Sequence, residues 1–282
     1  MMQAMAAPKT AHDVIFGDAL ELLPALADAS VHLVVTSPPY WSIKEYADGD
    51  AREIGRPQAY DAYLGSLAAV WRECFRLLHP GCRLAVNVGD QYLRARDHGR
   101  YRILPIGADT VRAGIDAGFD FMGNVIWHKV STTKTTGGCS FMGSMYFPKD
   151  GHVTYEHEYV ILFRKPGAWP RPDEDAKRAS ELTKQERSLW FRGLWRIAPE
   201  RQSAGHAARF PLELPQRLIR MYSFAGETVL DPFLGSGTTT LAAVGAGRSS
   251  IGIELCEGYR AAIEARLGGV SRARVRIGAS VT

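Results

Sequence analysis

A short motif, Ser37-Pro38-Pro39-Tyr40, directly follows the apolar run 31–35, which is typical of a buried strand. Two consecutive prolines hold φ at about −65° and donate no backbone hydrogen bond, so they form a rigid turn whose two carbonyl groups are expected to remain free acceptors. Ser37 adds a side-chain acceptor, and Tyr40 adds an aromatic face. An amino group on a flat ring, such as the exocyclic amine of a nucleobase, matches these groups. An ordinary Pro-Pro turn explains the motif equally well.

A second motif runs from a strand through a glycine loop into a helix. Residues 229–239 read Val-Leu-Asp-Pro-Phe-Leu-Gly-Ser-Gly-Thr-Thr. Glycines let a ligand approach the backbone, and the N-terminus of the helix favours a carboxylate or phosphate. Glu254 comes 23 residues after Asp231, at the end of the next strand, where an acidic side chain contacts ribose hydroxyls in nucleotide-binding folds. Loop and acid together predict a nucleotide-like cofactor.

Two single residues carry weaker signals. Asp18 follows the strand-like run 13–16 and is either another cofactor contact or a helix N-cap. His206 precedes Phe210 and the helix ahead of the glycine loop, and one histidine alone is more often structural than catalytic. The four cysteines are scattered without a Cys-x-x-Cys pair, so we expect reduced thiols and no metal site.

Strand-like runs alternate with helical patterns along the chain. Strands are expected at 13–16, 31–35, 83–88, 159–163 and 250–253, and helices at 60–79, 214–224 and 238–246. The first helix is expected to end at Pro80-Gly81. This alternation predicts an α/β fold with a mainly parallel sheet and helices on both faces. Ligands are then expected beyond the carboxyl ends of the strands.

Together the motifs resemble those of DNA methyltransferases that modify exocyclic amino nitrogens with S-adenosylmethionine. The family's catalytic motif, Asp/Asn/Ser-Pro-Pro-aromatic, is matched by residues 37–40, and its cofactor motif, Asp-Pro-Phe-x-Gly-Ser-Gly-Thr-Thr, by residues 231–239. The resemblance spans residues 13–260, and the catalytic motif comes first, as in the permuted β group. It implies a Rossmann-like methyltransferase fold in a single catalytic domain, residues 1–282.

The resemblance also implies roles for individual residues. The catalytic residues would be Ser37, Pro38, Pro39 and Tyr40. The cofactor-binding residues would be Asp18, Asp231, Phe233, Gly235, Ser236, Gly237, Thr238, Glu254, His206 and Phe210. The reaction would consume S-adenosylmethionine and release S-adenosylhomocysteine, without a metal.

Three segments lack a clear helical or strand pattern. Residues 41–57 and 129–152 are expected to be mobile loops that contact DNA. Residues 166–203 would be the target-recognition insert, by the same resemblance. From 164 to 209 there are eleven Lys or Arg and six Asp or Glu, which suits a polyanion or simply a solvated surface. The expected DNA contacts are Trp41, Lys44, Lys129, Lys134, Arg192, Arg196 and Arg201.

Length and composition set the broad class. The chain has 282 residues, 46% of them hydrophobic and 23% charged, which excludes a collagen, a disordered chain and a disulfide-built mini-protein. No apolar run approaches the roughly 20 residues that span a bilayer, and no signal peptide is evident. We therefore expect a soluble cytoplasmic protein, nucleoid-associated in a prokaryote. Its expected partners are double-stranded DNA and a second copy of itself, because dimers are common in the β group.

The sequence leaves the target base open. Adenine-N6 enzymes of this group usually have Asp or Asn at the position of Ser37, and cytosine-N4 enzymes usually have Ser, but both amines need the same two acceptors. Methylation of RNA or of a protein amide is an alternative, and so is a catalytically silent DNA-binding regulator. A restriction partner and a solitary epigenetic role are equally compatible with the chain.

Overall fold

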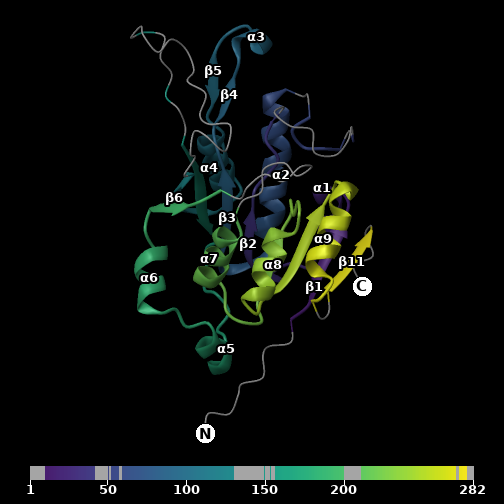
Figure 1. Cartoon of the computed structure of the whole chain (residues 1–282), viewed down its shortest axis with the longest axis vertical. Helices are drawn as coiled ribbons and strands as arrows, with labels where there is room; N and C mark the ends of the chain where they lie inside the picture. The colour runs from purple at the N-terminus through teal and green to yellow at the C-terminus, as the bar shows by residue number, and fades with distance from the viewer. Residues whose placement is uncertain are drawn as a thin grey trace.

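The structure is a computed structural model that describes residues 10–41, 50, 52–56, 59–129, 149, 153, 156–199, 211–270 and 273–277. Its centre is a nine-stranded sheet in the order β11-β1-β10-β9-β2-β3-β7-β6-β8 (Figure 1). Among these strands, β7 alone runs antiparallel to its neighbours. The strands are β1 (His12–Phe16), β2 (Val31–Thr36), β3 (Leu78–Val88), β6 (Asp120–Lys129), β7 (His157–Arg164), β8 (Leu194–Ile197), β9 (Thr228–Asp231), β10 (Ser249–Glu254) and β11 (Ala273–Ile277).

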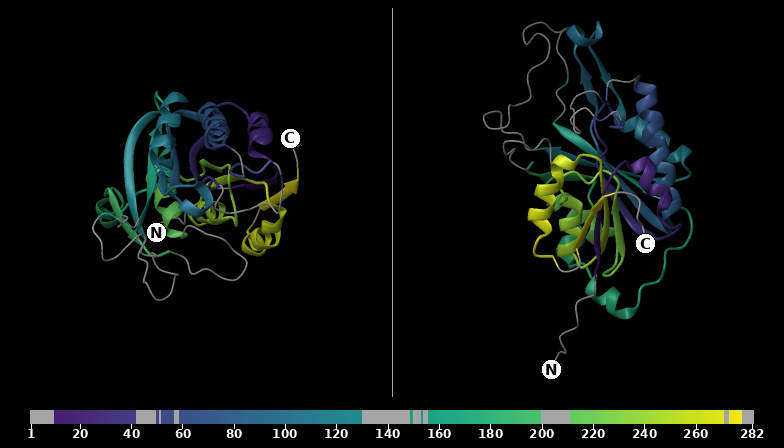
Figure 2. Two further views of the ribbon diagram at one scale, coloured as in Figure 1. Left: turned by 90° about the horizontal axis from the view of Figure 1, so that it is seen from above. Right: turned by 90° about the vertical axis from the view of Figure 1, so that its right-hand side faces the viewer.

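Helices cover both faces of this sheet. In Figure 2, α1, α2 and α4 lie on one side and α7, α8 and α9 on the other. Within β2, Val34 packs in the core beneath α2, whereas Leu33 and Val35 pack in the core beneath α7 and α8, as the alternation of a strand requires. The helices are α1 (Ala19–Leu22), α2 (Tyr60–Leu77), α3 (Ala95–His98), α4 (Ile106–Asp116), α5 (Glu174–Ala179), α6 (Lys184–Trp190), α7 (Glu213–Tyr222), α8 (Thr238–Gly245) and α9 (Arg260–Leu267), with 3₁₀ turns at Leu23–Ala25 and Glu257–Tyr259.

The end of α2 differs from expectation. The helix stops at Leu77, and the chain passes directly into β3, which contains Pro80 and Gly81. Gly81 has φ +77°, its N–H donates to the Lys165 carbonyl (2.8 Å), and an added Cβ would clash with the Trp169 backbone nitrogen. The Pro-Gly pair therefore bends the start of a strand so that another segment can cross it, and the prediction that it ends the helix was wrong.

Several elements gave no clear sequence pattern. These include α4, the ten-residue strand β6, and a separate two-stranded sheet of β4 (Gln91–Leu93) and β5 (Arg102–Leu104), which flank α3. The first half of β6 is mostly exposed, which removes the apolar alternation that would have revealed it. The main prediction, an α/β fold with a mainly parallel sheet covered on both faces, is confirmed.

The sheet has a point at which the chain diverges in two directions. β2 and β9 lie side by side at its centre; the chain leads from β2 to β3 on one side and from β9 to β10 on the other. Such a divergence opens a crevice beyond the carboxyl ends of the two strands, where ligands bind in open α/β sheets. In the described part of the chain, no helix combines the length and apolarity that crossing a membrane requires.

Candidate active site

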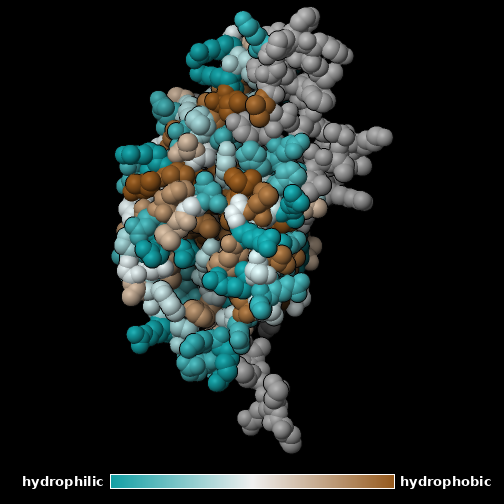
Figure 3. Space-filling model, turned by 90° about the vertical axis from the view of Figure 1, so that its left-hand side faces the viewer, coloured by the Kyte–Doolittle hydropathy of each residue, from teal (hydrophilic) through white to brown (hydrophobic). Residues whose placement is uncertain are grey.

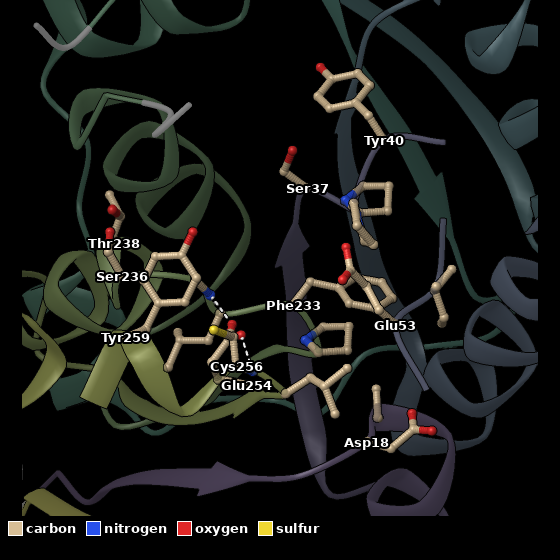
Figure 4. A pocket seen from close by; sticks show the side chains of 18 of the residues that line it. Asp18, Ser37, Tyr40, Glu53, Phe233, Ser236, Thr238, Glu254, Cys256 and Tyr259 are labelled. Atoms are coloured by element: carbon tan, nitrogen blue, oxygen red, sulfur yellow. Dashed lines mark hydrogen bonds between the residues drawn. The ribbon is translucent and has the colours of Figure 1, made fainter. Parts of the chain in front are cut away.

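The turn at residues 37–40 and the glycine loop meet at this crevice, although almost 200 residues separate them in the chain. They line one pocket of about 1140 Å³, counted out to its open mouth. In Figure 4, Ser236, Glu254 and Tyr259 stand on the left, and Ser37 and Tyr40 stand to their right, above Phe233 and Glu53. The remaining lining residues are Gly17, Asp18, Ala19, Pro38, Pro39, Arg52, Ile54, Trp127, Lys129, Glu158, Pro232, Leu234, Gly235, Thr238, Leu255 and Cys256.

The turn after β2 offers two acceptors to this pocket. Among the described residues, no hydrogen bond involves the Ser37 hydroxyl or the Pro38 carbonyl. The Pro39 carbonyl, in contrast, accepts a hydrogen bond from the Tyr63 hydroxyl of α2 (3.0 Å). The expectation that both prolyl carbonyls are available was therefore wrong: one fixes the turn to α2, and the other remains an open acceptor.

Glu158 on β7 is one of several pocket residues that the sequence analysis missed, with Glu53 and Tyr259 among the others. Its carboxylate accepts hydrogen bonds from the Tyr40 hydroxyl (2.9 Å) and the Asn87 amide (2.6 Å), and it pairs with the Lys129 ammonium. Its side chain is only 14% exposed, so these bonds form in a largely dry environment. They hold the Tyr40 ring at the pocket wall. The one available signal was an acid at the start of an otherwise apolar run.

Lys129, predicted to contact DNA, is the last residue of β6 and lies in the pocket wall. Its ammonium sits 4.8 Å from the centroid of the Trp127 ring, which is buried and donates from Nε1 to the Ile197 carbonyl (2.9 Å). Because the same ammonium pairs with Glu158, its position is fixed by two neighbours. It can therefore face a ligand in the pocket.

The glycine loop provides the opposite wall. Gly235 and Gly237 adopt φ of +58° and +85°, conformations that favour glycine, and a Cβ added at Gly235 would have no neighbour within 4 Å. Glu254 accepts hydrogen bonds from the backbone N–H groups of Gly235 (2.6 Å) and Cys256 (2.8 Å), drawn in Figure 4. Burial raises the pKa of Glu254 to about 7. The wall thus combines open space beside the backbone with an acid that can accept from hydroxyl groups.

Asp231 does not line the pocket, contrary to its predicted role as a cofactor contact. It is 1% exposed and accepts hydrogen bonds from the hydroxyls of Thr36 (2.7 Å) and Thr239 (2.6 Å) and from the Phe233 N–H (3.0 Å). Burial raises its pKa to about 6. Because Thr36 directly precedes Ser37, Asp231 joins the turn at residues 37–40 to the glycine loop.

The other predicted cofactor residues that the structure describes line the pocket, except Gly237, which does not. Asp18 both lines it and caps α1, accepting from the Leu20 N–H (2.9 Å), so its two expected roles coexist. Phe233 meets the Trp71 ring edge-on, with centroids 6.5 Å apart. Arg266 of α9 donates to the Thr238 hydroxyl (3.1 Å), which fixes the first turn of α8. His206 and Phe210 lie outside the described residues.

The predicted DNA contacts differ in their exposure, and some lie outside the described residues. Trp41 is 9% exposed and belongs to the core, with its ring edge-on to Tyr60, so it offers no face to DNA. Arg192 and Arg196 are exposed just before and within β8. Lys44, Lys134 and Arg201 lie outside the described residues, as do most of loops 41–57 and 129–152.

The expected target-recognition insert, residues 166–203, divides between two ends of the sheet. The hydroxyl of Ser180, which follows α5, accepts hydrogen bonds from the Ala225 N–H (2.7 Å) and from the Arg248 side chain. Arg248 is the residue directly before β10. α5 therefore lies at the end opposite the pocket, at the bottom of Figure 1, with α6 above it. β8 runs parallel to β6, so the chain returns toward the pocket only at the end of β8.

Comparison with known proteins places the chain in a family. A family model described as DNA methylase matches residues 31–265. Two curated relatives are the Type II methyltransferase M.MjaI of Methanocaldococcus jannaschii, 35% identical over 92% of each chain, and the Type II methyltransferase M.MthZI of Methanothermobacter thermautotrophicus, 36% identical over 92% of this chain and 77% of that one.

Solved structures agree. A candidate DNA modification methylase from Thermus thermophilus, in complex with S-adenosyl-L-methionine, is 38% identical and superimposes with a TM-score of 0.75 over 94% of this chain and 99% of that one. The PvuII DNA methyltransferase, which is cytosine-N4-specific, shares the fold with a TM-score of 0.65 at 24% identity over 94% and 90% of the two chains. The chain therefore belongs to the DNA methylase family, the exocyclic amino DNA methyltransferases whose cofactor is S-adenosylmethionine.

Proposed function

We propose that the protein methylates the exocyclic amino nitrogen of one base, adenine N6 or cytosine N4, at a specific site in duplex DNA after that base has left the helix. The observation that carries this proposal is a pair of acceptors, the Ser37 hydroxyl and the Pro38 carbonyl, that accept no hydrogen bond from the described residues and lie beside Tyr40, across the pocket from the glycine loop. A flat ring with an amino group fits this arrangement.

The Tyr40 side of the pocket would receive the base. Extruding a base costs a few kcal/mol, and stacking on an aromatic ring returns about 1–3 kcal/mol. Glu158 holds the Tyr40 hydroxyl, so little further ordering of the ring is needed when the base arrives. The two N–H donors of the amine would then face Ser37 and Pro38. These bonds draw the nitrogen lone pair out of conjugation and direct it toward the glycine loop.

The other side would hold the cofactor. S-adenosylmethionine supplies a methyl group on a positively charged sulfur. Glu254 would accept from the ribose hydroxyls, Asp18 would lie near the adenine, and the backbone of Gly235 and Ser236 would contact the amino-acid part. From beneath the pocket, Asp231 holds the turn and the glycine loop in fixed relative positions through its hydrogen bonds. No strong base is required, because the nitrogen becomes acidic once methylated, and positioning supplies most of the rate enhancement.

Labelled methyl transfer tests the proposal. Pooled duplex DNA, RNA and protein are each incubated with the enzyme and the labelled cofactor, and the products are digested and identified by mass spectrometry. We expect N6-methyladenine or N4-methylcytosine in the DNA alone, and a much lower rate with Ser37→Ala. Label in RNA or protein would favour the alternative substrates. Cofactor binding without any transfer would favour a silent DNA-binding regulator.

A homodimer is part of the proposal. β8 is an edge strand of the described sheet, and the apolar side chains of Leu194 on it and of Leu189 and Phe191 just before it are 42–50% exposed. Figure 3, seen from the side of β6 and α6, shows brown apolar patches among hydrophilic residues. A second copy would cover such a surface. Light scattering of the wild type and of Leu194→Glu measures the molar mass of each in solution. A wild-type dimer that the substitution dissociates agrees with the proposal, and a monomeric wild type contradicts the proposal.

A further inference from the structure

A short hairpin extends from the end of β3, at the same end of the sheet as the pocket. It consists of β4, α3 and β5 and projects beyond the body of the molecule at the top of Figure 1 and of the right-hand view in Figure 2. Leu104, opposite Gln91 at its base, and Leu93, at the end of β4, are both buried, and Gly99 (φ +73°) ends α3 at its tip. The hairpin is thus anchored at its base and exposed at its tip.

The tip carries an unusual density of positive charge. Arg94, Arg96, Arg100 and Arg102 lie within nine residues, and all four are exposed. The single acid between them, Asp97, pairs with Arg96 (3.2 Å). The other three make no ion pair with any carboxylate that the structure describes.

Elsewhere in the described chain no nine-residue stretch holds four arginines; some, such as Arg72 and Arg171, are exposed singly without an ion pair, and others are paired. Arg112, Arg164 and Arg178 each pair with a carboxylate on the same helix or the neighbouring strand. Those pairs largely cancel the charge that the surface presents. The hairpin instead presents about three uncompensated charges in one small volume, which is the arrangement that attracts a polyanion.

Trp41 connects the hairpin to the catalytic turn. Its carbonyl accepts a hydrogen bond from the Gln91 side chain on β4, and its ring lies 5.8 Å from the His98 ring on α3. Trp41 directly follows Tyr40 in the chain, and it is buried. The position of the arginines is therefore fixed relative to the ring on which the base would stack.

We propose that this hairpin is a DNA-binding element whose arginines bind phosphates of the duplex beside the extruded base. The proposal rests on the proposed function for the identity of the partner and adds a contact surface that the sequence analysis did not predict. A two-stranded ribbon is narrow enough to lie along a groove of the duplex, and each arginine that neutralises a phosphate releases counterions. The arginines thereby hold the target next to Tyr40.

The test compares two triple variants of the full chain that lose the same charge. One is Arg94→Ala/Arg100→Ala/Arg102→Ala; the control, at the opposite end of the sheet, is Arg171→Ala/Lys177→Ala/Arg178→Ala. Fluorescence anisotropy with a random-sequence duplex gives Kd over a range of salt concentrations. For the hairpin variant we expect binding on the order of 100-fold weaker at about 0.1 M salt, and a salt slope reduced by about 2–3. The control should bind like the wild type.

Further measurements distinguish a loss of DNA binding by the hairpin from a folding defect and from a failure of the proposed function. The variant Arg94→Lys/Arg100→Lys/Arg102→Lys should retain most of the affinity, because it keeps the charges, and calorimetry should show unchanged cofactor binding in all variants. Equal affinity of wild type and hairpin variant, or equal weakening in the control, would overturn the inference. A wild type that binds DNA through the hairpin but methylates none would refute the proposed function instead.

Discussion

Replacing Glu158 by Gln tests the network that holds Tyr40. The substitution keeps the side chain's shape but changes one acceptor oxygen to an N–H₂ donor. Three donors converge on the carboxylate, from Tyr40, Asn87 and Lys129. An amide cannot satisfy all three, and Lys129 loses its partner in a partly buried position.

The size of the effect follows from these contacts. A hydrogen bond to a charged group contributes about 1.5–3 kcal/mol when it is largely shielded from water. If Glu158→Gln releases the Tyr40 hydroxyl and displaces Lys129, a loss of about 2 kcal/mol in transition-state positioning lowers kcat/KM by about 30-fold. Tyr40→Phe removes the hydroxyl alone and should cost about 5- to 10-fold. The double variant should be little worse than Glu158→Gln, because the hydroxyl acts through the same carboxylate.

The assay is labelled methyl transfer under single-turnover conditions, with cofactor affinity measured in parallel by calorimetry. A 2-aminopurine placed at the target, once sequencing of methylated DNA has located it, reports capture of the extruded base. Cofactor affinity should change little, since Glu158 lies on the Tyr40 side of the pocket. Full activity and unchanged base capture in Glu158→Gln, or strictly additive losses in the double variant, would refute the reasoning.

Three further predictions concern pH and stability. Burial raises the pKa of Glu254 to about 7, and the ribose hydroxyls would favour its ionised form. Cofactor affinity measured by calorimetry should therefore rise about tenfold from pH 6 to 8. Glu254→Gln should abolish this pH dependence. His32 accepts a hydrogen bond from the Thr228 N–H (3.3 Å), and burial lowers the pKa of His32 to about 4. Its contribution to the free energy of unfolding is therefore complete above about pH 6.5, and it falls by about 1–2 kcal/mol toward pH 4. Denaturant titrations at several pH values should show this fall, and His32→Asn should reduce it. Gly81→Ala should cost about 2–4 kcal/mol in the same titrations, because φ is positive and the Trp169 backbone leaves no room; an unchanged midpoint would mean that the crossing segment can move.

The sequence predicted the fold class and the two motifs because each has a strong local signal. The prolines at 38 and 39 have one plausible geometry, and the glycines at 235 and 237 are required where φ is positive. Apolar runs such as 31–35 are buried on both faces, so they identify central strands of a parallel sheet.

Other parts of the site depend on contacts that no local pattern encodes. Glu158 reaches Tyr40 across 118 residues, through the pairing of β7 with β3. Trp41 resembled an exposed aromatic because its burial depends on the hairpin and α2, which lie further along the chain. Asp231 belongs to a motif typical of ligand binding, yet its carboxylate oxygens accept hydrogen bonds from the hydroxyls of Thr36 and Thr239. In each case tertiary packing decided the role.

The most direct measurement of the central claim is the chemical identity of the methylated product. Duplex DNA treated with wild-type enzyme and labelled cofactor is digested to nucleosides and analysed by mass spectrometry beside Ser37→Ala. A pocket built from an open Pro38 carbonyl, the Ser37 hydroxyl and Tyr40 predicts methyl on an exocyclic nitrogen, greatly reduced by the substitution. Methyl on a ring carbon, or the same yield from Ser37→Ala, would contradict it.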